Sequence, residues 1–466
     1  MIKIGNEPLR SGLRYLLAGG VMLSLGSAAA SAQSTTAPPE VNANLNTIQE
    51  INLTPMQKIG KTLDDNGIYF TSRYTGQFAA NPAGGERQGS AYAGDLTFGA
   101  TLDLGKILDI PGGSIHILFN DRSGASLSAQ TINSDLAVQN IYGAGQTYQL
   151  AILTYEQKLF NNTVDVNLGR TDIAFLTSPL YCDFETHGDC GRPYGMSKNV
   201  SSSVYPEAVW GGRILIQPVP EFYGKVGIYQ PNPDLAPAKS HGFDWGIKSA
   251  DGVIVPVELG YQHKVPGAMV ADQYDIGFFA SSAPYTASFY DKTDPDFDNR
   301  GAVYIQAQKM VYQAEPNSPR GIYLFGMGLL TTSGGKQVAH SQTSFGLIWQ
   351  GVFASRPLDR FGFQVNDYQF NQRYLQSLYA TRIKAGGSGF PKTNQATFEI
   401  NYMIQATRWL QIMPNFQYLI NPDGLATTPY PKHNIANAEV IGLQFSIDLP
   451  SLLGITSYPL SLEQDN

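Results

Sequence analysis

The chain has 466 residues, of which 42% are hydrophobic, 11% aromatic and only 15% charged, and its formal net charge is −7. A negative balance disfavours binding to nucleic-acid phosphates, so no nucleic-acid partner is expected. Outside the N-terminus the sequence has no apolar run of about 18 residues, which excludes a helical membrane span, and any passage through a membrane must use strands.

The first 32 residues carry the features of a secretory signal peptide in their usual order. Basic residues come first, an apolar stretch follows at 15–25, and residues 30–32 (Ala-Ser-Ala) form a small-x-small cleavage site. A buried N-terminal helix is the alternative, but such a helix needs no cleavage site. We therefore expect residues 1–32 to be a signal peptide that is cleaved on export, and the small, polar residues 33–54 to be a flexible leader.

Residues 55–66 predict a short amphipathic helix. Met56, Ile59 and Leu63 recur at the i, i+3 and i+7 spacing of one helical face. Such a helix could plug or cap the periplasmic mouth of a barrel, or it could be tethered to the surface, and the sequence does not decide between them.

From residue 67 to residue 449 the apolar period changes to two, with segments of about ten residues that suit tilted membrane-spanning strands. The predicted strands are 67–77, 92–104, 113–120, 146–159, 163–171, 209–217, 221–229, 252–263, 301–312, 321–331, 343–354, 360–370, 398–405, 410–418 and 439–449. About fifteen or sixteen strands result, and no helical stretch is expected between them.

Long polar connections alternate with tight reversals along this region. Residues 231–242 and 280–299 are long connections, whereas 161–162 and 219–220 are tight. Long loops on one side and short turns on the other are typical of outer-membrane barrels. The predicted fold class is therefore all-β: a transmembrane antiparallel up-and-down β-barrel of about 16 strands over residues 67–449, with the short helix on its periplasmic side.

The polar faces of these strands predict a water-filled lumen. They are rich in amides and carry charges of both signs, which suits hydrogen bonding to neutral, hydroxyl-rich solutes better than a ring of one sign. The candidate pore-lining residues are Arg73, Asp95, Arg122, Glu156, Arg213, Glu258, Glu399, Asn401 and Gln417. The alternative is that the charged members only pair with one another to satisfy buried charges in the wall.

The two cysteines are Cys182 and Cys190, eight residues apart in a segment rich in Gly and Asp. In an exported protein an even pair at this spacing predicts a disulfide that closes a small loop. A metal site formed by Cys182, His187 and Cys190 is the alternative.

The sequence contains none of the usual catalytic motifs. It has no Gly-x-Ser-x-Gly elbow and no His-Glu-x-x-His, and Gly60-Lys61-Thr62 lacks the leading glycine of a phosphate-binding loop because Pro55 stands there. We expect no enzyme activity and no cofactor. An enzyme built on an outer-membrane barrel, or an adhesin with long loops, stays the alternative.

Four segments of the chain resemble the carbohydrate-selective porin family (OprB type) of Gram-negative outer membranes. They are 55–70, 154–172, 351–362 and the last three strands with 418–424 between them. The resemblance implies a 16-stranded barrel with one pore per chain, passive diffusion of mono- and small oligosaccharides, and a constriction lined by Arg and Glu. It also implies contact with outer-membrane lipid and with the barrel-assembly machinery. A general small-solute porin is the second reading, and the sequence is compatible with a homo-oligomer.

The matching segments support some candidate residues more than others. Glu156 lies in a matched segment at a wall position, whereas Arg170 and Arg356 are also matched but lie at strand ends and fit the rim or a turn better. Arg122 is supported by alternation alone.

The C-terminus departs from the family. Barrels of this type commonly end on an aromatic residue, but here Leu449 is followed by residues 450–466. Either these residues are a flexible extension, or 454–458 add an edge feature to the barrel. Pro450 favours the extension, because proline cannot donate to a sheet ladder.

Overall fold

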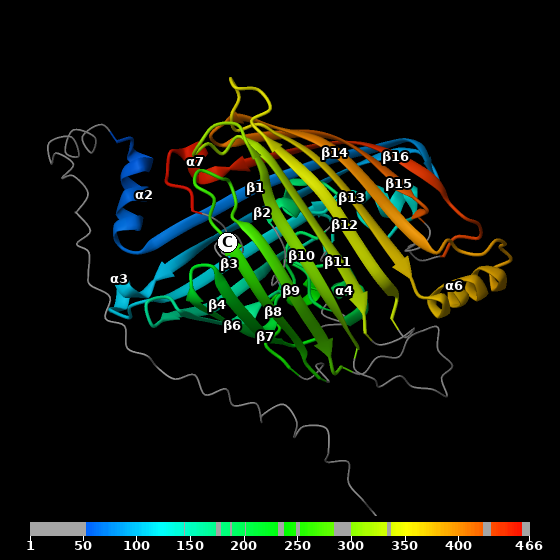
Figure 1. Cartoon of the computed structure of the whole chain (residues 1–466), viewed down its shortest axis with the longest axis horizontal. Helices are drawn as coiled ribbons and strands as arrows, with labels where there is room; N and C mark the ends of the chain where they lie inside the picture. The colour runs from blue at the N-terminus through cyan, green and yellow to red at the C-terminus, as the bar shows by residue number, and fades with distance from the viewer. Residues whose placement is uncertain are drawn as a thin grey trace, which may run out of the picture. The chain divides into compact units, whose positions relative to one another are not determined.

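The computed structural model describes residues 53–143, 145–173, 179–186, 189–200, 202–231, 237–247, 252–283, 300–332, 337–422 and 430–458. Within these residues sixteen antiparallel strands form one closed barrel, in which each strand pairs with its neighbours in the chain and β1 pairs with β16 (Figure 1). The predicted barrel is thus confirmed. Residues 1–52, with the predicted signal peptide and nearly all of the predicted leader, lie outside the described residues.

Some strands, such as β1 and β14, are longer than the sequence analysis predicted, others, such as β4 and β8, are shorter, and one was missed. Their bounds are β1 Ile68–Gly85, β2 Gly89–Asp103, β3 Gly113–Gly124, β4 Tyr148–Leu159, β5 Val164–Thr171, β6 Val209–Val219, β7 Phe222–Tyr229, β8 Ile254–His263, β9 Asp272–Ser281, β10 Arg300–Gln313, β11 Gly321–Thr331, β12 Ala339–Gln350, β13 Arg360–Phe370, β14 Asn394–Thr407, β15 Leu410–Ile420 and β16 Ala436–Asp448. The missed strand is β9, which completes the count.

Helices lie before, between and after the strands, and those between the strands contradict the expectation of none. They are α2 Pro55–Asp65, α3 Leu104–Leu108, α4 Tyr194–Val200, α5 Pro237–Ser240, α6 Gln372–Lys384 and α7 Leu449–Leu453, with a π-helical turn at Ser128–Ile132 and a 3₁₀ turn at Pro179–Asp183. The predicted N-terminal helix corresponds to α2, whose start is fixed by a capping box between Thr54 and Gln57. None of the helices in the described residues is long and apolar enough to cross a membrane.

Side chains alternate between an apolar outer face and a polar inner face. On β14, Ile400 is 46% exposed on the outside, whereas its neighbour Glu399 is 1% exposed on the inside. On β9, Ile276 is 59% exposed and Asp275 is buried. Because large apolar side chains cover the outer face, that face suits the lipid core of a membrane.

The two ends of the barrel differ in their connections. At one end β6 and β7 are joined by residues 220–221, and β14 and β15 by 408–409. Helices α2, α3 and α7 lie at this end and α6 lies at the other (Figure 1). In outer-membrane barrels the short turns face the periplasm, so α2 lies at the periplasmic end.

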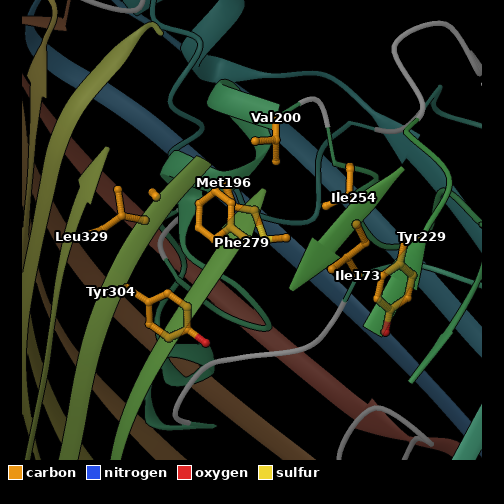
Figure 2. Close-up of a cluster of buried hydrophobic side chains, with 9 residues drawn as sticks. Ile173, Met196, Val200, Tyr229, Ile254, Phe279, Tyr304 and Leu329 are labelled. Atoms are coloured by element: carbon orange, nitrogen blue, oxygen red, sulfur yellow. The ribbon is translucent and has the colours of Figure 1, made fainter. Parts of the chain in front are cut away.

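The described residues of the connection between β5 and β6, within 172–208, fold into the barrel and are called the inserted loop below. Met196 and Val200 of its helix α4 pack against Phe279, Tyr304 and Leu329, which point inward from β9, β10 and β11 (Figure 2). An apolar core therefore lies inside the barrel, against one side of its wall.

The tail after β16 adds no strand over residues 449–458, which are the part of it that the structure describes. Pro450 lies in the first turn of α7, where proline is well tolerated because no backbone donor is needed there. Beyond α7, a Cβ placed on Gly60 of α2 would lie 2.7 Å from the Ile455 side chain, and the ring of Tyr458 lies 4.6 Å from that of Tyr69. The described part of the tail is thus packed against α2 and the start of β1.

Candidate functional site

The nine residues predicted to line the pore all occupy inward positions of the wall, but they fall into three groups. One group holds loops that enter the barrel, a second pairs with charges on neighbouring strands, and Arg73 is half-buried on β1. The register of the strands explains the shared direction, because Asp95 opposes Arg122 and Glu399 opposes Gln417 in adjacent strands.

The first group forms a seat for the inserted loop on β14 and β15. The carboxylate of Glu399 accepts hydrogen bonds from the backbone N–H groups of Glu185 and Thr186, at 2.9 and 2.7 Å. Asn401 Nδ2 donates to the carbonyl oxygen of Asp183 at 2.8 Å. The two bonds to the Glu399 carboxylate are charge-assisted and about twice as strong as neutral ones, so they fix the backbone of the inserted loop against the wall.

Gln417 holds a second connection in the same way. Its Nε2 donates to the carbonyl oxygen of Val138, in the loop between β3 and β4, at 3.0 Å. Glu399, Asn401 and Gln417 are at most 4% exposed. All three side chains are buried and bind polypeptide backbone, so contact with solute at these positions stays a prediction.

A second carboxyl group lies in this seat. Glu185 of the inserted loop is fully buried, and its carboxylate accepts a hydrogen bond from Asn415. Burial raises the pKa of Glu185 well above the usual carboxyl range, and the neighbouring charge of Glu399 raises it further, although the bond from Asn415 opposes the shift. Burial and the neighbouring carboxylate thus both disfavour the charged form of Glu185.

The cysteines constrain the same segment. Cys182 and Cys190 are joined by a disulfide, with their Cα atoms 4.7 Å apart, and the residues bound by Glu399 lie between them. Thiolate ligation by these sulfurs is thereby excluded, while His187 lies outside the described residues. In the part of the chain that the structure describes, no group of three His, Cys, Asp or Glu side chains could hold a metal ion.

The second group begins with an ion pair between β2 and β3. Asp95 Oδ2 accepts from Arg122 Nε at 2.7 Å, and Asp95 Oδ1 accepts from Asn120 Nδ2 at 2.9 Å. The Arg122 guanidinium lies 5.8 Å from the ring of Tyr205, in the inserted loop. This pair therefore lies where the wall meets the inserted loop.

Glu156 and Arg213 are mostly buried, with side chains 10% and 9% exposed, but they lie near an exposed lysine on the same stretch of wall. Glu156 accepts from His116 Nε2 at 2.7 Å and pairs with Lys158 at 3.0 Å, and the Lys158 side chain is 44% exposed. Arg213 pairs with Asp165 on the adjacent strand at 3.3 Å. The alternative weighed above, mutual pairing of wall charges, thus describes both residues.

Beside this stretch, at the periplasmic end, lies a cavity of about 960 Å³. It is bounded by the turns after β4, β6 and β8 and by Pro179 of the inserted loop. Amide side chains line it, among them Asn161, Gln217, Gln262 and Gln308. The cavity is large enough for a small solute and offers hydrogen-bonding groups without a single dominant charge.

Glu258 is part of a buried network that the sequence analysis largely missed. Its carboxylate lies 3.0 Å from Tyr223 Oη, 2.8 Å from Tyr304 Oη and 3.6 Å from Lys225 Nζ. Asp275 of β9 accepts from Gln306 and also contacts Tyr223. Asp275 was missed because β9 was not predicted, and the two tyrosines were not among the candidate residues.

The inner face of β11 gives a signal that the sequence analysis did not use. Its inward residues are Tyr323, Phe325, Met327 and Leu329, all buried. A strand that faces water on the inside would need polar residues there. An apolar inner face indicates instead that a segment of the chain covers this part of the wall.

Comparisons with known proteins agree on one family. The family model described as "Carbohydrate-selective porin, OprB family" matches residues 87–449. Porin B of Pseudomonas aeruginosa is 27% identical over 408 residues, which cover 82% of this chain and 87% of that protein. The putative porin QuiX of Acinetobacter baylyi is 27% identical over 384 residues, or 78% of this chain and 86% of that protein.

A solved structure matches the barrel as well. The high-pH structure of Pseudomonas putida OprB superposes with a TM-score of 0.74 at 25% identity, covering 83% of this chain and 95% of that chain. The low-pH structure of the same protein gives a TM-score of 0.51 at 21% identity, with 87% and 97% covered, and supports the fold alone.

Proposed function

Because this chain belongs to the OprB family of carbohydrate-selective porins, and is thus an outer-membrane carbohydrate porin, we propose that mono- and small oligosaccharides cross it by passive diffusion along the inner wall of β4–β6. In this proposal the inserted loop narrows the barrel from the side of β9–β11 and β14–β15. The protein acts as a channel and catalyses no reaction.

One observation carries this choice of path. The inner wall of β9–β11 is covered by the apolar part of the inserted loop, whereas Lys158 on β4 keeps 44% of its side chain exposed. The amide-lined cavity beside it opens at the periplasmic end. Hydroxyl groups of a sugar can exchange hydrogen bonds with such amides and with charges of both signs, weakly enough to leave as well as enter.

Swelling of liposomes that contain the purified protein tests the solute class. We expect faster swelling in glucose than in a zwitterionic amino acid of similar size, and slower swelling as maltose and then maltotriose replace glucose. Equal rates for sugar and amino acid would make this chain a general small-solute porin. A protein that gives no swelling and no bilayer conductance would contradict the channel itself and favour an enzyme or adhesin.

A further inference from the structure

A segment of the β7–β8 connection is folded against the outside of the barrel. Residues 241–247, called the outer clip here, lie over outward-facing positions of β4 and β6. The backbone N–H of Leu150 donates to the carbonyl oxygen of His241 at 2.9 Å, and Trp210 Nε1 donates to the carbonyl oxygen of Trp245 at 3.1 Å. The outer clip is thus attached to the wall at two points, by backbone and by side chain.

The position of the outer clip is fixed further by a glycine and a buried cation. Gly242 has φ +76°, and a Cβ there would lie 2.2 Å from the Leu150 carbonyl oxygen, so only glycine fits. Beneath the clip, the guanidinium of Arg170 lies 5.8 and 5.9 Å from the rings of Trp210 and Trp245 and is shielded from solvent. An outward arginine in a barrel wall is costly when it faces lipid, and the outer clip covers this one.

Despite this attachment, the outer clip exposes large apolar side chains. Phe243 is 45% exposed, Trp245 46% and Ile247 66%. The surface continues directly into the membrane-facing band of the wall, where Leu168 and Ile214 are 50% and 41% exposed. A held loop with three such side chains leaves apolar area in contact with water unless a partner covers it.

We propose that the outer clip is a membrane anchor that places Phe243, Trp245 and Ile247 in the outer leaflet, at the boundary between acyl chains and head groups. Tryptophan favours this boundary because its ring is apolar and its N–H can still be satisfied. The partner is lipid rather than a second copy of the chain, because the surface is continuous with the lipid-facing band. The clip also lies at the end of the barrel opposite α2, beside the first residues of β6. The proposal depends on the membrane location and not on which solute passes.

Tryptophan fluorescence in bilayers tests this placement. The chain has four tryptophans, and the triple variant Trp210→Phe, Trp349→Phe, Trp409→Phe leaves Trp245 alone. In phosphatidylcholine liposomes we expect bromine near the head groups to quench Trp245 roughly twofold more than bromine near the chain ends, with little quenching by aqueous iodide. A variant that keeps only Trp349, which faces outward from β12, serves as the reference for a tryptophan on the wall.

Two results would overturn the proposal. Strong quenching of Trp245 by iodide with none by bromolipid would place the clip in water. Emission that changes with the protein-to-lipid ratio would assign the surface to a second copy.

Because Trp210→Phe removes a donor to the clip, a second variant keeps all tryptophans and changes Phe243→Ser and Ile247→Ser. We expect aqueous iodide to quench this variant in bilayers more strongly than it quenches the parent, and equal quenching of the two would also contradict the anchor.

Discussion

Two stretches of the inner wall carry the same alternating polar pattern, but their polar side chains contact different groups. On β14–β15, Glu399, Asn401 and Gln417 are bound to the backbone of loops and are nearly inaccessible. On β4–β6, Glu156 and its neighbours pair among themselves, and Lys158 keeps contact with solvent. Alternation therefore fixes which way a side chain points in a barrel, while the loops decide whether it meets water, solute or polypeptide.

The largest effect is expected when the contacts that hold the inserted loop on β14 are removed. Glu399→Ala removes the acceptor of two buried backbone N–H groups, each costing about 1–3 kcal/mol when left unpaired, so we expect roughly 3 kcal/mol or more of lost stability. The inserted loop should then leave the wall, and single-channel conductance should rise and become noisy. Glu439→Ala is the matched control, because Glu439 is exposed on the outer face of β16. Equal melting temperatures for the two variants would show that the seat does not hold the loop.

Breaking the disulfide should loosen the same segment by a smaller amount. Opening a loop of eight residues costs about 2–3 kcal/mol in the chain-entropy account, because the unfolded chain gains freedom. The chain has only two cysteines, so a reductant acts on this bond alone. We expect the Cys182→Ser, Cys190→Ser variant to melt lower than the parent and to be insensitive to dithiothreitol. A reductant effect in that variant would mean that the effect on the parent does not come from the disulfide.

The pH dependence should follow the buried acids of the inserted loop. Burial raises the pKa of Asp172 to about 6, although the charge of Arg192 and backbone hydrogen bonds oppose this shift. Because the folded pKa lies above the ordinary value of about 3.9, the stabilising contribution of Asp172 is complete below about pH 4 and is lost as the pH rises through about 6. Glu185, whose pKa is also raised, acts in the same direction.

We therefore expect the inserted loop to be held more tightly in mild acid than at neutral pH, by about 3 kcal/mol at most for Asp172. Hydrogen exchange of α4 at pH 4 to 8 measures this, after correction for the intrinsic pH dependence of exchange. Asp172→Asn should flatten the profile over that range. An unchanged slope in the variant would assign the pH dependence to other groups.

Much of the fold could be predicted from the sequence, because each strand repeats the same two-residue rule. β9 was missed for a physical reason: its consecutive Phe278 and Phe279 break the alternation. Phe278 faces outward and is 40% exposed, while Phe279 packs inside against α4. The helix α6 was missed because only strands were sought between residues 67 and 449.

For the candidate site, the sequence predicted only that the side chains point into the barrel, and not what they contact there. Nothing near Glu399 in sequence indicates that its partners are backbone groups 213 and 214 positions earlier in the chain. Such contacts depend on how the inserted loop closes, and local alternation does not encode this. The apolar inner face of β11 was the available signal, since Phe325 and Met327 would not face water without a cost.

The smallest effect is expected on the inner wall of β4–β6, where Lys158 is exposed. Lys158 faces inward from β4 with 44% of its side chain exposed, and Lys309 faces outward from β10 with 54% exposed. Lys158→Glu reverses a charge inside the lumen, and a change of about 1 kcal/mol in the local potential should shift the anion-to-cation permeability ratio toward cations by roughly fivefold. Lys309→Glu makes the same change on the outer face and should leave the ratio as it is. Reversal potentials in a salt gradient compare the two variants directly. If both shift the ratio equally, or if neither does, the β4–β6 wall does not border the path that ions take, and the proposed route for sugars along it loses its support.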